Sequence, residues 1–540
     1  MNKKNYWPYL LISAIAAILY LPFLGHVRLF DWDEINFAEC AREMLITRDF
    51  LHVQINYHPF YEKPPLFIWM QALSMMLFGV NEFAARFPNA LCGILTLIVL
   101  FFIGKKEFSS RFGWWWMWAY AGSILPQFYF KSGIIDPWFN LFIFLSVYQN
   151  FILERKKNLG QSGVRNAVYT AIFLGLAVLT KGPVALIIFI LCWLASRLTI
   201  QGRKNLFNPE LLILVFVTII VSSSWFVMIW FHDGSGQLKL FINYQWKLLT
   251  TGEAGHGEPF YYHWVILLFG CFPASVLLFL RNKNPGNESS SQIEWKNYMW
   301  IMLLVVLILF SIVKTKIVHY SSLCYFPLTF LAARSLYLHG VEWKNKTGMN
   351  LLFWIIGLSI SCVLILLPYL GTHIESVSNL VLDPFTKENM KTSVQWPWWT
   401  FVPGIIFLIS IPASYLLHKR FQNRFLFQFA ATILVIQLSQ LFIVPRIEKY
   451  TQDVPASFYQ SLKGKDVYVE VYGMKSYAHL FYFQKPFEKN NLSIDSLLDG
   501  KITKPAYFVA RIDVPWNILN HQGVKEVFRK NGFVFYRRDP

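Results

Sequence analysis

The chain has 540 residues, of which 55% are hydrophobic, 18% aromatic and only 15% charged. So apolar a composition excludes an ordinary soluble domain and indicates a polytopic membrane protein. Lys and Arg number 49 against 31 Asp and Glu, a formal net charge of +18. The functional meaning of this net charge depends on where the basic residues lie along the chain.

Apolar stretches recur along most of the chain. A transmembrane helix needs about 20 mostly apolar residues, and about thirteen stretches approach that length. They fall near residues 7–25, 83–103, 114–130, 137–153, 166–180, 183–196, 209–230, 261–280, 298–313, 320–338, 350–370, 400–417 and 426–444. We therefore expect a membrane all-α fold over residues 1–445, with about thirteen transmembrane helices.

The basic residues test this layout, because short cytoplasmic loops collect Lys and Arg. With the N-terminus inside, every second loop should be basic. The basic groups are Lys105, Lys106 and Arg111; Arg155, Lys156, Lys157 and Arg165; Arg197, Arg203 and Lys204; Arg281, Lys283 and Lys296; Arg334, Lys344 and Lys346; and Lys419, Arg420 and Arg424. The positive charge thus indicates which loops face the cytoplasm and is not a sign of nucleic-acid binding. Because the number of spans is odd, residues 446–540 are expected outside.

The first outer loop, residues 26–82, is long and begins with an acidic stretch. Its carboxylates between Phe30 and Met44 are Asp31, Asp33, Glu34, Glu39 and Glu43. Asp31 and Glu34 have the spacing of a capping box, which would give them a structural role. Asp33 has no such role. The apolar residues that follow share one helical face, which predicts an amphipathic helix on the membrane surface.

A second amphipathic helix is expected later in this loop, from the stretch EKPPLFIWMQALSMMLFG. Pro64 and Pro65 suit a first helical turn, and the apolar run is too short to span. Glu62 and Lys63 then lie at a helix N-terminus, where free N–H groups favour an anion such as phosphate. The alternative is that Lys63 only extends to the interface and pairs with Glu62.

Further polar motifs fall on the same outer side. They are Asp136 in KSGIIDPW, Lys181 in LTKGP, Glu253, His256 and Glu258 in TTGEAGHGEPFYYHW, and Lys314, Lys316 and His319 in KTKIVHYSS. The layout of the spans used only apolar length and basic loops, yet every unusual polar motif lies on one face. This agreement indicates a functional site outside the membrane rather than at its midplane.

The chain changes character after about residue 445. Short alternating runs, KDVYVEVY, AYFVARID and GFVFYRR, predict strands separated by turns. We expect a small soluble α/β domain over residues 446–540, outside the membrane, in the periplasm if the cell has two membranes. With no phosphate-binding loop and no catalytic cluster, it is better interpreted as a lid or acceptor-docking module than as a second active site.

Taken in order, these motifs resemble a known family. DE-x-x-x-AE-x-AREM, EKPPLF-x-W-x-QAL, FG-x-x-EFAAR-x-P-x-A, an Asp opening the fourth span, LTKGP, HG-x-PFYY and K-x-x-HY are similar to the GT-C glycosyltransferases that use a polyprenyl-phosphate sugar. Within that superfamily the chain resembles the lipid A aminoarabinose (ArnT-like) transferases and the protein O-mannosyltransferases. The resemblance covers residues 1 to about 445.

The resemblance implies roles for individual residues. It gives catalysis to Asp33, as base or acceptor-positioning carboxylate, with its neighbour Glu34 and the second outer acid Asp136. It gives the donor phosphate to Lys63, Lys181 and Lys316. It also implies a divalent metal, zinc foremost, at Glu62 and His256, and no nucleotide cofactor. Relatives of the aminoarabinose type usually carry Arg where this chain has Asn36, and Asn does not neutralise phosphate.

The function implied is transfer of a sugar from a polyprenyl (undecaprenyl) phosphate carrier in the bacterial inner membrane. Lipid A, a surface glycan and an exported protein all remain possible acceptors. A polytopic transporter or a flippase of lipid-linked sugars is the alternative, but its charges should lie near the bilayer midplane. Here the charges gather outside, which favours the transferase.

Overall fold

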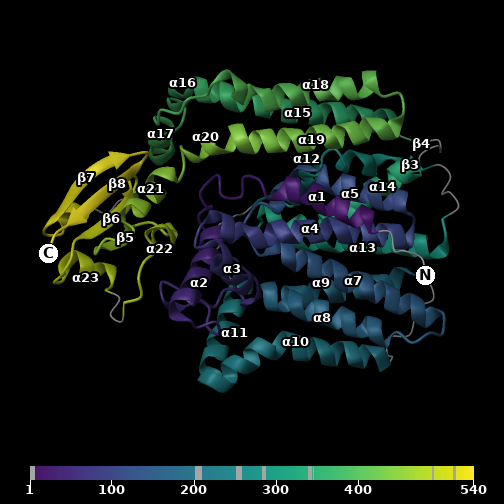
Figure 1. Ribbon diagram of the computed structural model, residues 1–540, viewed down its shortest axis with the longest axis horizontal. Helices are drawn as coiled ribbons and strands as arrows, with labels where there is room; N and C mark the ends of the chain where they lie inside the picture. The colour runs from purple at the N-terminus through teal and green to yellow at the C-terminus, as the bar shows by residue number, and fades with distance from the viewer. Residues whose placement is uncertain are drawn as a thin grey trace.

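A computed structural model of the chain describes residues 6–200, 209–250, 258–282, 288–338, 343–344, 346–488, 492–514 and 518–540. Most of the described chain is helical (Figure 1). The helices of the bundle and its outer loops are α1 (Trp7–Tyr20), α2 (Asp33–Thr47), α3 (Leu66–Phe78), α4 (Glu82–Glu107), α5 (Ser110–Ala121), α6 (Ile124–Tyr129), α7 (Asp136–Asn158), α8 (Val164–Lys181), α9 (Val184–Thr199), α10 (Pro209–Asp233), α11 (Ser235–Thr250), α12 (Tyr262–Gly270), α13 (Ser290–Ile312), α14 (Tyr325–Tyr337), α15 (Lys346–Thr372), α16 (Ile374–Ser378), α17 (Pro384–Met390), α18 (Val402–Leu417), α19 (Phe421–Phe442) and α20 (Val444–Glu448).

Shorter elements join these helices. They are the 3-10 helices η1 (Ser275–Phe279), η2 (Val318–Cys324) and η3 (Trp398–Phe401) and the strand pairs β1 (Gln54–Ile55) with β2 (His58–Pro59) and β3 (Arg281–Asn282) with β4 (Trp343–Lys344). The long helices run side by side (Figure 1), and small residues allow some of them to approach closely. A Cβ atom on Gly104 of α4 would lie 2.8 Å from the Cα atom of Gly113 of α5.

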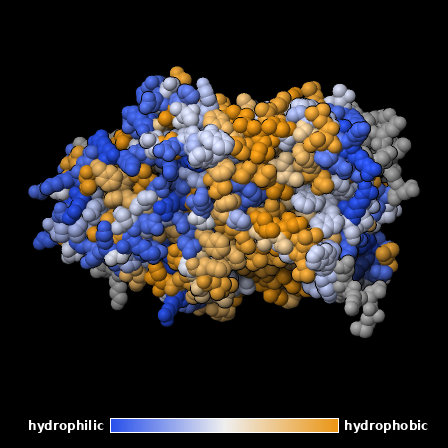
Figure 2. Space-filling view, turned by 45° about the horizontal axis from the view of Figure 1, so that its top comes forward, coloured by the Kyte–Doolittle hydropathy of each residue, from blue (hydrophilic) through white to orange (hydrophobic). Residues whose placement is uncertain are grey.

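The bundle carries an apolar belt between two polar ends. Figure 2 shows hydrophobic residues around the middle of the visible face and hydrophilic residues toward both ends. Within the described residues, 7 helices are long and apolar enough to cross a membrane: Glu82–Glu107, Val164–Lys181, Pro209–Asp233, Ser290–Ile312, Lys346–Thr372, Trp398–Leu417 and Phe421–Glu448. Because helices this long and apolar are stable with their side chains exposed only where lipid replaces water, the chain is an integral membrane protein.

The C-terminal residues form a mixed sheet at one end of the bundle (Figure 1). Its strands are β5 (Tyr468–Tyr472), β6 (Ala506–Arg511), β7 (Val524–Lys530) and β8 (Phe533–Arg538), in the order β5-β6-β8-β7. Only β5 and β6 are parallel, and the helices α21 (Asp453–Leu462), α22 (Ala478–Phe483) and α23 (Ile494–Asp499) and the 3-10 helix η4 (Ile518–Asn520) accompany them. Strands β5, β6 and β8 fall on the three predicted runs, whereas β7 was not predicted because its charged residues obscure the alternation.

The first outer loop lies between the bundle and this sheet (Figure 1). Arg42 of α2 and the hydroxyl of Tyr57 both donate to the carbonyl oxygen of Lys485, at 3.0 and 2.6 Å, and the Tyr482 hydroxyl accepts from the Leu29 N–H at 2.8 Å. Residues 34–44 of α2 are all buried. The expectation that α2 lies on the membrane surface is therefore wrong, because α3 and α22 enclose it.

The predicted capping of α2 is also wrong. The helix begins at Asp33, its N-cap residue is Trp32, and no side chain caps it. Asp31 instead accepts a hydrogen bond from the N–H of Trp32 at 3.0 Å. The second helix of the loop, α3, begins at Leu66 with Pro65 at its N-cap, one residue later than the proline pair predicted.

Candidate active site

The most exposed acid of the candidate site is Asp33, at the first position of α2. The preceding residue, Trp32, has a φ of +79°, which is unusual for a bulky side chain. Such strained backbone is common where a functional residue must be held in one direction. The Asp33 side chain keeps 41% of its surface exposed, so an incoming molecule can reach its carboxylate.

A buried ion pair lies beside Asp33. Asp136, the first residue of α7, is 4% exposed, and its Oδ1 atom accepts a hydrogen bond of 2.5 Å from Nζ of Lys181, the last residue of α8. The ammonium group also lies over the rings of Tyr320 and Phe139, 5.0 and 5.6 Å from their centroids. A charge held by a carboxylate and two rings is fixed in position.

His319 joins the two acids. Its Nε2 atom lies 3.5 Å from Oδ2 of Asp33 and 3.8 Å from Oδ2 of Asp136. The residue belongs to η2, far along the chain from both acids. His319 lies in the motif KTKIVHYSS, whose local sequence predicts no catalytic role for it, and only the fold brings it to Asp33.

The surroundings of Asp33 change its acidity. Burial raises the pKa of the Asp33 carboxyl above its ordinary value, and the negative charge of Asp136 raises it further. The positive charges of His319, Lys63 and Lys181 oppose this rise. The Asp33 carboxylate is thus a stronger base than a fully exposed aspartate, although the three nearby cations limit the rise in its pKa.

The remaining predicted residues divide into those near Asp33 and those elsewhere. Lys63 precedes α3, pairs with Glu62 at 3.1 Å and influences Asp33 electrostatically. Lys316 is buried, donates to the carbonyl oxygen of Val313 at 3.0 Å and lies near His263. His256 lies outside the described residues. The ion pair of Lys63 with Glu62, the alternative to phosphate binding, is thus present, and phosphate binding by Lys63 stays a prediction.

Glu34, predicted with Asp33, faces in another direction. Its carboxylate is 2% exposed and accepts from Arg86 of α4 through Nε at 3.0 Å and Nη2 at 2.7 Å. The N–H groups of Phe30 and Gly133 also donate to it. Both oxygens are therefore used within the protein, and Glu34 ties α2 to α4 and to the loop before α7.

Asn36 lies one turn after Asp33 on α2. The side chain is 6% exposed, and its Oδ1 atom has no hydrogen-bond partner among the described residues. A buried oxygen without a partner is costly unless a ligand or water satisfies it. Asn36 thus places a neutral acceptor oxygen one helical turn from Asp33.

Together these residues form a half-buried carboxylate with a raised pKa, a buried carboxylate, an imidazole and two lysines. The arrangement can accept a proton and place positive charge near a leaving anion. It stands at the end of the bundle that carries the outer loop and the sheet (Figure 1).

Comparisons with known proteins find relatives of this chain among glycosyltransferases. A family model described as dolichyl-phosphate-mannose-protein mannosyltransferase matches residues 62–230. Two curated relatives are named undecaprenyl phosphate-alpha-4-amino-4-deoxy-L-arabinose arabinosyl transferase. One, from Pectobacterium carotovorum, is 24% identical over 60% of this chain and 58% of its own length. The other, from Wigglesworthia glossinidia brevipalpis, is 26% identical over 62% of this chain and 60% of its own length.

The match thus spans about three fifths of each relative. A solved structure covers far more of the chain. ArnT from Cupriavidus metallidurans, bound to undecaprenyl phosphate, has a TM-score of 0.74 at 17% identity and covers 99% of this chain and 98% of its own. The same protein in the apo state gives a TM-score of 0.73. The chain therefore has the GT-C fold of ArnT and resembles the arabinosyl transferases and protein mannosyltransferases in sequence, as its motifs predicted.

Proposed function

We propose that the protein is a membrane glycosyltransferase that moves a sugar from a polyprenyl phosphate, undecaprenyl phosphate in bacteria, to an acceptor. The observation that carries this proposal is the meeting of Asp33, Asp136, Lys181 and His319 at the outer end of an apolar bundle. The names of the relatives and the undecaprenyl phosphate bound to ArnT support the donor class.

The residues fit the chemistry of this transfer. The acceptor oxygen bonds to the anomeric carbon, the bond from that carbon to the phosphate oxygen breaks, and the phosphate leaves with the electron pair. Asp33 takes the proton of an acceptor hydroxyl. Lys63 and Lys181 offset the charge that develops on the departing phosphate, and Asp136 holds Lys181 in place. His319 lies where it can orient Asp33 toward the acceptor.

The same proposal includes the arrangement in the membrane. We place about thirteen spans in the bacterial inner membrane, with the basic loops inside and Asp33 on the periplasmic side. Residues 1–445 would form the catalytic domain, and residues 446–540 a soluble periplasmic domain. The contacts of Lys485 and Tyr482 with the first outer loop support a role of this domain in covering the site.

The acceptor classes differ in what they require of Asp33. A glycan or protein hydroxyl must lose a proton, whereas a lipid A phosphate is already ionised and needs only to be oriented.

The decisive experiment for this function is a transfer assay combined with a deletion strain. Purified protein with a synthetic polyprenyl-phosphate sugar should release the polyprenyl phosphate only when an acceptor is present. Mass spectrometry of lipid A, lipid-linked sugars and envelope glycoproteins should then show one glycan missing from the deletion strain, with its lipid-linked donor accumulating. Movement of the lipid-linked sugar across vesicles without any transfer would instead support the flippase.

We also propose a divalent metal, zinc foremost, held by Glu62 and His256. When bound it would supply positive charge near the leaving phosphate. Glu62 pairs with Lys63 at 3.1 Å, at the start of the segment that leads into α3, so a bound metal would share this carboxylate with the ammonium group. Chelation should lower transfer, and added Zn²⁺ should restore it in the wild type but not in His256→Ala. Undiminished transfer after chelation would remove this metal from the mechanism.

The raised pKa of Asp33 predicts how activity depends on pH. The base must be ionised, so transfer to a hydroxyl should fall as the pH drops through the pKa of Asp33, at a higher pH than for an exposed aspartate. Lys63→Met removes a charge that lowers this pKa, so the acidic limb of the kcat/KM profile should move to still higher pH. The exposed Lys391→Met serves as the control and should leave the limb unchanged.

A further inference from the structure

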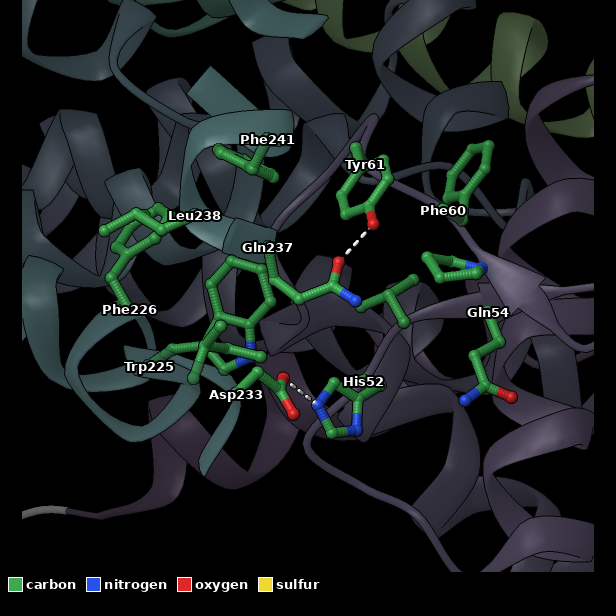
Figure 3. A pocket seen from close by; sticks show the side chains of 13 residues that line it. His52, Gln54, Phe60, Tyr61, Trp225, Phe226, Asp233, Gln237, Leu238 and Phe241 are labelled. Atoms are coloured by element: carbon green, nitrogen blue, oxygen red, sulfur yellow. Dashed lines mark hydrogen bonds and ion pairs between the residues drawn. The ribbon is translucent and has the colours of Figure 1, made fainter. Parts of the chain in front are cut away.

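A second group of polar residues lies on the other side of the segment that carries Lys63. The Tyr61 hydroxyl donates to Oε1 of Gln237 on α11, whereas the neighbouring Glu62 and Lys63 pair with each other. Tyr61 thus lines a pocket of about 240 Å³ between the first outer loop and α10–α11, together with Phe60, Trp225 and Phe241 (Figure 3).

Two histidines and a carboxylate meet at the edge of this pocket. Nε2 of His52 lies 2.6 Å from Oδ2 of Asp233, and Nδ1 of His232 lies 2.7 Å from Oδ1 of the same carboxylate. Figure 3 shows His52 and Asp233 facing each other. One donor atom from each of His52, His232 and Asp233 lies within 4.8 Å of the others.

A fourth residue orients the cluster. Oδ2 of Asp49 lies 2.6 Å from Nδ1 of His52, and Oδ1 of Asp49 accepts from the N–H groups of Leu51 and His52 at 3.0 and 3.1 Å. A carboxylate that holds one nitrogen of an imidazole and directs the other nitrogen outward is the usual support of a metal-binding histidine. The loop that carries His52 is also anchored to α10, because Trp225 Nε1 donates to the carbonyl oxygen of Leu51 at 2.8 Å.

The charges of the cluster also favour a divalent cation. Asp49 and Asp233 contribute two negative charges, and neutral imidazoles contribute none. His232 and Asp233 end α10, so the partial negative charge of a helix C-terminus adds to the attraction. With metal–ligand bonds of about 2.0–2.2 Å, the ligand atoms of a tetrahedral site lie about 3.3–3.6 Å apart. The 2.6 Å contact between His52 and Asp233 would therefore lengthen on binding, and any wider separation, at most 4.8 Å here, would shorten.

We infer that His52, His232 and Asp233 bind one divalent transition-metal ion, best Zn²⁺, with Asp49 orienting His52. Imidazole nitrogens and a carboxylate are ligands that suit zinc and not Mg²⁺. His52 precedes β1 and the other two ligands end α10, so the ion would fasten the first outer loop to the α10–α11 hairpin. This site is separate from the proposed pair Glu62 and His256, and its test needs no transfer activity.

The test measures Zn²⁺ bound to the purified full-length protein, stripped of metal and titrated in detergent. To remove any contribution of Glu62, we compare Glu62→Gln with Glu62→Gln/His232→Ala and Glu62→Gln/His52→Ala. Each histidine variant should lose one equivalent of Zn²⁺, and Asp49→Asn should bind about 10- to 100-fold more weakly. Added Mg²⁺ should not compete.

The matched control is His521→Ala, because His521 forms a similar pair with Asp499, at 2.7 Å, with no third ligand among the residues that the structure describes. This variant should keep the equivalent. His232 is 65% exposed, so its replacement leaves the fold intact even if the His52 variant misfolds. Equal Zn²⁺ binding in Glu62→Gln and Glu62→Gln/His232→Ala would overturn the proposal and leave an imidazolium between two carboxylates as the explanation of the geometry.

Discussion

Asp33→Asn is expected to lower the rate of sugar transfer by about 10²- to 10⁴-fold if the acceptor is a hydroxyl. Asn has nearly the same shape but does not take up a proton. The Asp33 side chain is 41% exposed, so its replacement by the neutral Asn removes a charge that water already solvates in part. The variant should therefore insert, fold and elute from a sizing column as the wild type does.

The matched control is Asp31→Asn, two residues earlier. Asp31 lies beside Ser476 and Tyr477 of the C-terminal region and does not contact His319. Its substitution should leave the transfer rate within a few fold of the wild type. Unchanged transfer in Asp33→Asn would contradict the role of Asp33 as base. A loss well below the stated range, with a raised KM, would indicate that Asp33 orients an acceptor that is already ionised.

The general architecture could be predicted because it depends on local sequence. Lipid imposes a long apolar run on every span, so runs such as 83–103 and 350–370 coincide with α4 and α15. The alternation of hydrophobic and polar residues likewise located β5, β6 and β8. Asp33, Asp136 and Lys181 were predicted separately, and the fold brings them together.

Other features depend on contacts between distant segments and have no local signal. The spacing of Asp31 and Glu34 predicted a capping box, but the partner of Glu34 is Arg86, 52 residues away. His52 meets Asp233 across 181 residues. The partner of a buried carboxylate is set by the three-dimensional fold and not by sequence spacing. Glu34 therefore has the spacing of a capping residue in the sequence but links α2 to α4 through Arg86 in the structure.

Glu34→Ala is expected to lower the free energy of unfolding by about 3–5 kcal/mol, because it removes one partner of a buried ion pair. Arg86 would keep its hydrogen bonds to the carbonyl oxygens of Leu24, Val27 and Arg28 but would lose its counter-charge. The N–H groups of Phe30 and Gly133 would lose their acceptor as well. Denaturant unfolding of the detergent-solubilised protein measures this loss.

Two variants distinguish the structural role of Glu34 from a catalytic one. Glu388→Ala removes an exposed pair with Lys391 and should cost less than about 1 kcal/mol. Glu34→Gln keeps the shape and an acceptor oxygen, so it should be destabilised less than Glu34→Ala. Because Glu34 contacts Arg86 and not the Asp33–His319 pair, the Glu34→Gln protein that remains folded should transfer sugar at close to the wild-type rate. If the Glu34→Gln protein is folded but as inactive as Asp33→Asn, Glu34 has a catalytic role, because unfolding would then not explain the loss of transfer.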